Sequence, residues 1–211
     1  MLGKTAAHIF WMFRYLERCE NTARIINASH FISLTQKQNI TNQWDSILNV
    51  GGNKSFFLAK YGEVKKSTVI NFTLRDKTNP SSVLSLIGNA RQNARVVRNN
   101  LTKEVFETIN ETYLILSNIF KRPINEKNLL NTLSIIRTKC QLARGTLHGT
   151  MLRDDTYILA RMGTFIERAD NTSRILDIKY YVLLPSVGFV GSNVDNAQWE
   201  NILRSVSAYR S

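Results

Sequence analysis

A set of carboxylate, amide and guanidinium side chains near the N-terminus is the part of this sequence best suited to chemistry. The set consists of Arg14, Glu17, Glu20, Asn21 and Arg24. At the helical rotation per residue, these five side chains lie within an arc of about 120°. Arginines can hold a carboxylate or phosphate, and a carboxylate can carry a proton. The arc therefore has the groups that an anion-binding or acid–base site would need.

The same set occurs again 150 positions later, where residues 167–176 align with residues 17–26 without a gap. The equivalent positions in the second copy hold Glu167, Asp170, Asn171 and Arg174. Met12 aligns with Met162, and after a small insertion the Gln-Trp pairs at 43–44 and 198–199 also align. Ordered matches of this kind indicate an internal duplication, with copies at 1–50 and 151–205.

Long helices must position both polar sets. Apolar residues continue the polar arc toward both ends of the helix, and a second apolar stripe lies on the opposite face, as expected of a helix that is buried on both sides. We therefore predict an all-α helical bundle with a duplicated long helix (1–34 and 151–184). The two helices are expected to pack face to face and antiparallel about a pseudo-two-fold axis. Four carboxylates would then meet three arginines in a largely water-free centre, where an unpaired charge is costly.

The rest of the chain also reads as helical. Helices are predicted at about 39–49, 80–100, 102–120 and 125–147, with a last one beginning near residue 195. Residues 68–73 are ambiguous, because their β-branched side chains favour a strand that would have no partner in this sequence.

Three interpretations of the duplicated polar set remain open. It could be a structural network of ion pairs that fixes the register of the two copies. It could instead be a ligand or catalytic pocket, with Arg24 and Arg174 holding an anion and Glu17 or Glu167 carrying a proton. The third interpretation is a carboxylate-bridged metal site, but paired metals in bundles use Glu-x-x-His, and the nearby arginines repel cations. We expect no metal and no cofactor.

Two further places carry candidate groups. Arg91, Arg95 and Arg98 recur on one side of the predicted helix at 80–100, where they would form either an anion-binding stripe or a solvated face. His148, in what reads as a loop between two glycines, could act as a base, although a lone loop histidine is more often structural. Cys19 is expected to be a small core residue.

Composition limits the kinds of partner. With 28 Lys and Arg against 16 Asp and Glu, the net charge of +12 favours an anionic small molecule or an acidic protein. The basic residues are dispersed, so nucleic-acid binding rests on charge alone and is a weak alternative. No run approaches the roughly 18 apolar residues that a membrane span needs. With no signal-peptide pattern and two cysteines, we expect a cytoplasmic protein.

Several segments together resemble the bacterial Alpha-E family of helical domains. They are residues 10–24, 79–83, 93–98, 150–154 and 166–177. The resemblance implies an all-helical fold and an association with circularly permuted ATP-grasp proteins and transglutaminase-like proteins. It leads to our working prediction, an accessory or catalytic component of an ATP-grasp-linked system that forms amide bonds. The alternative is a non-enzymatic scaffold that docks on such a ligase.

The sequence departs from the family pattern at three places. Phe13 and Thr164 stand where relatives usually have Gly and Arg, so a symmetric second arginine is missing at position 164. Relatives also continue for about one more helical unit after the position of Ser211. We therefore expect residues 1–211 to form a single Alpha-E-like domain that is short at its C-terminal end.

Overall fold

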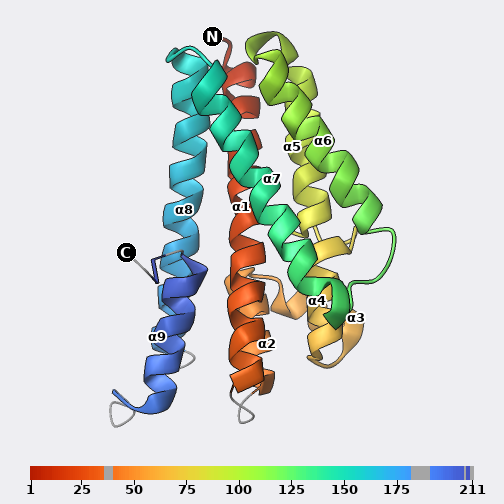
Figure 1. Ribbon diagram of the computed structural model, residues 1–211, viewed down its shortest axis with the longest axis vertical. Coiled ribbons are helices and arrows are strands. Elements are labelled where there is room, and N and C mark those ends of the chain that lie inside the picture. Colours follow the sequence, from red (N-terminus) through yellow and green to blue (C-terminus); the bar gives the residue numbers. More distant parts are fainter. Residues whose placement is uncertain (36–39, 182–190, 207, 210–211) are drawn as a thin grey trace.

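Two long helices, α1 (Gly3–Thr35) and α8 (Asp155–Tyr181), lie side by side in the computed structural model (Figure 1). The structure describes residues 1–35, 40–181, 191–206 and 208–209. The predicted end of the second long helix, at 184, lies outside these ranges. Residues 4–35 contain neither Gly nor Pro, so nothing interrupts α1. The side chain of Asp154 accepts a hydrogen bond from the Tyr157 N–H at 3.2 Å and caps the start of α8.

The two long helices run in the same direction, so the predicted antiparallel packing is wrong. Gly163 of α8 packs on the backbone of Phe10 in α1, and residues further along α8 contact residues further along α1. The helix that precedes α8 in the chain explains this parallel direction. The 25-residue α7 (Glu126–Thr150) carries the chain back to the end of the molecule where α1 begins, and α8 starts there (Figure 1).

Three further helices complete the bundle around α1: two of them pack directly on α1, and the third packs on those two. They are α5 (Val83–Val96), α6 (Lys103–Ile119) and α7, with a short 3-10 turn, η1 (Arg98–Asn100), between α5 and α6. Each begins after a residue whose side chain caps it, and α5 begins at Val83 rather than at the predicted residue 80. The hydroxyl groups of Ser82 and Thr102 accept backbone N–H groups, and Asn125 forms a capping box with Asn128. Both α5 and α7 pack directly on α1.

Shorter helices close the far end of the bundle. These are α2 (Ile40–Val50), α3 (Lys54–Tyr61), α4 (Lys66–Arg75) and α9 (Asn193–Ser205). The ambiguous residues 68–73 are helical within α4, and the described part of the chain contains no strand. The side chain of Asn71 ties α4 to the segment before α7: it accepts a hydrogen bond from the Ile124 N–H at 2.9 Å and donates one to the Ile124 C=O at 3.0 Å. None of the described helices is both long and apolar enough to cross a membrane.

Candidate functional site

Two Glu-Arg dipeptides, one in each of the two aligned polar segments, pair with each other across the α1–α8 contact. Arg168 donates from Nε to Glu17 at 2.9 Å. In the reverse direction, Arg18 donates to Glu167 from Nε and, at 2.9 Å, from Nη2. Only 3% of Glu17 and 2% of Glu167 is exposed. The arginine of each dipeptide can reach the glutamate of the other because α1 and α8 run in the same direction, with positions 17 and 167 at the same level along the two helices.

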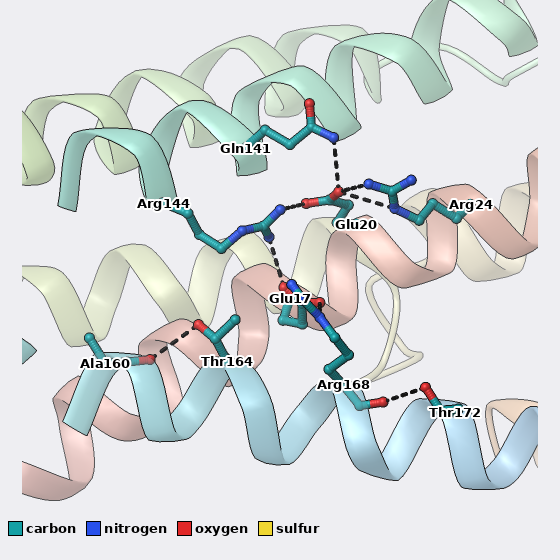
Figure 2. A network of polar contacts seen from close by, with 9 residues as sticks. All are labelled: Glu17, Glu20, Arg24, Gln141, Arg144, Ala160, Thr164, Arg168 and Thr172. Atoms are coloured by element: carbon teal, nitrogen blue, oxygen red, sulfur yellow. Dashed lines mark hydrogen bonds and ion pairs between the residues drawn. The ribbon is translucent and has the colours of Figure 1, made fainter. Parts of the chain in front are cut away.

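Each of these two glutamates has a second guanidinium partner. Arg14 of α1 donates to Glu167 at 2.7 Å. The position equivalent to Arg14 in the second copy is Thr164, whose hydroxyl donates to the backbone oxygen of Ala160 at 3.1 Å. Figure 2 shows that Arg144 of α7 occupies the corresponding role, donating to Glu17 at 2.8 Å. A residue outside the repeat therefore supplies the charge that position 164 lacks.

Glu20 is the most heavily bonded carboxylate. It accepts hydrogen bonds from Arg24 at 3.1 Å and from Gln141 at 3.0 Å, and it also pairs with Arg144 (Figure 2). Burial alone would raise the pKa of Glu20, but the positive charges of Arg144 and Arg24 outweigh this and lower it. The equivalent pair in α8, Asp170 with Arg174 at 3.1 Å, is more exposed.

The network carries more positive charge than the sequence predicted. Six guanidinium groups surround four carboxylates, so two positive charges remain unbalanced within it. The arginines are Arg14, Arg18, Arg24, Arg144, Arg168 and Arg174, and the carboxylates are Glu17, Glu20, Glu167 and Asp170. The predicted dry centre with adjacent carboxylates is present for the three glutamates, each at most 3% exposed. Asn21 is also buried there, and its Nδ2 has no hydrogen-bond partner within the part of the chain that the structure describes.

This geometry limits what the glutamates can do. Guanidinium groups donate hydrogen bonds to both carboxylate oxygens of Glu17 and of Glu167. Glu17 and Glu167 therefore suit a structural role better than proton transfer. Their assignment as proton carriers stays a prediction.

A cavity of about 120 Å³ adjoins the network on the side of α2 and α4. Asp170, Asn171 and Arg174 line it together with Arg18. The structure thus brings three of the predicted ligand-binding residues into one cavity. Arg14, Glu20, Asn21 and Arg24 do not line it.

The remaining candidates lie elsewhere. Arg91 donates to Asn110 of α6 at 2.7 Å and sits over the Tyr113 ring, while Arg95 is exposed. His148 lies in the last turn of α7 rather than in a loop. Burial and the neighbouring Arg161 and other arginines lower its pKa.

Cys19 is buried as expected, and it has a neighbour that sequence reasoning did not identify. Cys140 of α7 lies beside it, although the two are far apart in the sequence. Burial, followed by the Cys140 thiol, raises the pKa of Cys19 well above its usual range. Within the described ranges, no three His, Cys, Asp or Glu side chains gather closely enough to hold a metal ion.

Sequence reasoning missed three arginines of the network and the glutamine. Arg18 and Arg168 were visible in the aligned segments, but on the helical wheel they lie just outside the polar arc. Their long side chains reach back across it. Arg144 and Gln141 come from α7, for which the repeat gives no signal.

One family model matches the whole chain, residues 1–211. It is Alpha-E, described as a predicted alpha-helical domain with a conserved ER motif. The Glu17-Arg18 and Glu167-Arg168 dipeptides are the two Glu-Arg pairs of the network described above. No curated protein and no solved structure gives a significant match.

Proposed function

Because the chain belongs to the Alpha-E family, we propose that it is a non-enzymatic helical scaffold that docks on an ATP-grasp-type ligase in an amide-bond-forming system. A transglutaminase-like protein is the second partner that the family resemblance implies. In this proposal the Glu-Arg network holds the two long helices in register. Catalysis by Glu17 or Glu167 has less support, because each is held by two guanidinium groups.

An exposed apolar stripe on α8 is the observation that carries the proposal. Ile158, Met162, Phe165 and Ile166 lie on one face of the helix and are between 44% and 51% exposed. Contiguous apolar patches of this kind on a protein surface mark interaction sites.

Comparison of the two copies indicates what kind of surface covers the stripe. Met12 and Leu16 stand at the positions of Met162 and Ile166, and both are 0% exposed. They belong to α1, on which α5 and α7 pack. The same pattern of side chains on α1 is thus covered by two helices, and we expect the partner that covers the stripe on α8 to present a helical surface as well.

Charge at the edge of the stripe supports an acidic partner over a second copy of this chain. The guanidinium groups of Arg161 and Arg168 lie 4.6 and 5.6 Å from the centre of the Phe165 ring. Two copies, each with a net charge of +12, repel each other. A partner helix with an apolar ridge beside carboxylates would complement both the stripe and its basic edge.

Binding of the purified chain to the ATP-grasp protein of the same genome tests the proposal. Isothermal titration calorimetry should detect a complex, and Ile166→Glu should weaken it at least tenfold. Leu114→Glu is the matched control, because Leu114 is similarly exposed at 52% but lies on α6. It should leave the affinity unchanged.

Three results would contradict the proposal. One is that the two proteins do not bind. Another is that Ile166→Glu binds as tightly as the unchanged chain. The third is a dimer of this chain, measured by light scattering, that Ile166→Glu dissociates, because the stripe would then be covered by a second copy.

A further inference from the structure

The cavity beside the Glu-Arg network has a lining of mixed charge. It lies between α1, α2, α4, the segment joining α4 to α5, and α8. Its side of α8 carries Asp170, Asn171 and Arg174, whereas the apolar stripe occupies the opposite side of that helix. A ligand in the cavity and a protein on the stripe would therefore be separate binding events.

Hydrogen-bond donors in the cavity are left over after the ion pairs are made. Arg174 bonds Asp170 through Nε alone, so its two terminal amino groups have no partner among the described residues. Its Nη1 lies 4.0 Å from where a Cβ on Gly52 would stand, at the turn that follows α2. Arg18 uses Nε and Nη2 for Glu167, and its Nη1 makes no hydrogen bond to a residue that the structure describes. Such groups are suited to bind a carboxylate.

An anionic acceptor lies next to these donors. The side chain of Asp170 is 31% exposed, and Arg174 approaches it from one side, through Nε. A carboxylate can accept about four hydrogen bonds, so Asp170 can also accept from an ammonium group. With Arg18 and Arg174 against Glu167 and Asp170, the charged groups of the lining sum to zero.

Size and apolar surface restrict the ligand further. A water molecule needs about 10–15 Å³ of accessible cavity volume. The cavity of about 120 Å³ therefore holds roughly ten groups of that size. That is the size of an amino acid and too small for a nucleotide. Ile25, Ile47 and Phe72 give the lining an apolar part.

We propose that this cavity binds a free α-amino acid with an apolar side chain. Its carboxylate would accept hydrogen bonds from the terminal amino groups of Arg174, and its ammonium group would donate to Asp170. Its side chain would lie against Ile25, Ile47 and Phe72. A net-neutral site with its positive and negative groups kept apart matches a zwitterion better than it matches a simple anion.

Calorimetry or ligand-observed NMR with L-leucine tests the proposal. A Kd on the order of 1 mM is expected for a ligand of this size. N-acetyl-L-leucine lacks the ammonium group and L-leucine amide lacks the carboxylate, so each should bind at least fivefold more weakly. Inorganic phosphate tests for an anion site without other selectivity, and it should bind more weakly than leucine.

Variants connect the binding to the named groups. Arg174→Gln and Asp170→Asn should each weaken leucine binding at least tenfold. Both residues are partly exposed, so the thermal midpoint should change little. Asp177→Asn is the matched control on the same helix, at an exposed position outside the cavity, and should bind as the unchanged chain does.

Three results would overturn the proposal. They are a failure of leucine to bind at millimolar concentration, equal binding of leucine and phosphate, and an Arg174→Gln variant that binds leucine as the unchanged chain does. None of these results bears on the docking of a ligase, which is measured separately with Ile166→Glu.

Discussion

Replacing Arg144 with alanine removes a cation that α7 places between two buried carboxylates. The guanidinium bonds Glu17 at 2.8 Å and also pairs with Glu20, and the arginine side chain is 17% exposed. After the replacement, Glu17 keeps Arg168, and Glu20 keeps Arg24 with Gln141. Both carboxylates would remain buried with fewer positive charges to offset the loss of hydration.

The size of the effect follows from this loss of compensation. Removing one partner of a buried ion pair costs about 3–5 kcal/mol, and the remaining partners place Arg144→Ala near the lower end, at about 3 kcal/mol. For a chain of this length, each kcal/mol lowers the thermal midpoint by about 2–4 °C, so we expect a decrease of about 6–12 °C.

Thermal and urea unfolding, followed by far-UV circular dichroism, measure this. Arg95→Ala is the control, because Arg95 is exposed and makes no ion pair with a described residue. It should change the free energy of unfolding by less than about 0.5 kcal/mol. If Arg144→Ala is as stable as Arg95→Ala, the network does not stabilise the fold and our reasoning about it is wrong.

Three further predictions concern α7 with α8, close packing of glycines in these helices, and Asp76 at the end of α4. Adding Thr164→Arg to Arg144→Ala should restore part of the lost stability, because a guanidinium at the position equivalent to Arg14 can reach Glu17; no gain in the urea midpoint would contradict this. Gly163→Ala should destabilise the fold by about 2 kcal/mol or more, since its Cβ would lie 2.3 Å from the Phe10 oxygen. Gly145→Ala, with open space around its Cβ, should instead stabilise α7 by about 0.5–1 kcal/mol, and equal effects of the two replacements would refute the close contact. Hydrogen bonds from Lys60, Tyr61 and Thr78 outweigh the effect of burial and lower the pKa of Asp76, so the contribution of Asp76 to stability is present at neutral pH and is lost as the pH falls below about 4. Asp76→Asn should therefore lower the free energy of unfolding at pH 7 and reduce the loss of stability in acid, measured by urea titrations at several pH values. An unchanged pH profile would oppose this.

The helices could be predicted because their signals are local. The period of apolar residues located the helices at 80–120 and the start of α7 to within a few residues. In the structure these helices begin after caps at Ser82, Thr102 and Asn125. Residues 68–73 show the limit of local preference. Their β-branched side chains favour a strand, yet Val69, Ile70 and Phe72 are buried in helix α4, where tertiary packing decides.

The direction of packing could not be predicted from the duplicated segments. Two copies of a helix can meet in either direction with similar pairing of charges, and the choice depends on where the intervening chain returns. Here α7 brings it back to the start of α1 (Figure 1). Arg144 could not be predicted for the same reason, since only the packing of α7 on α1 places it beside Glu17 and Glu20.

A double-mutant cycle between Arg18 and Glu167 tests most directly whether the Glu-Arg motifs hold α1 and α8 together. Arg18→Gln, Glu167→Gln and the double variant are unfolded in urea, and their free energies of unfolding are compared with that of the unchanged chain. We predict that each single variant is destabilised and that the coupling energy is about 1–3 kcal/mol, as expected for a partly buried bidentate pair. Full stability of Glu167→Gln with a coupling energy near zero would contradict the structural role of the motif.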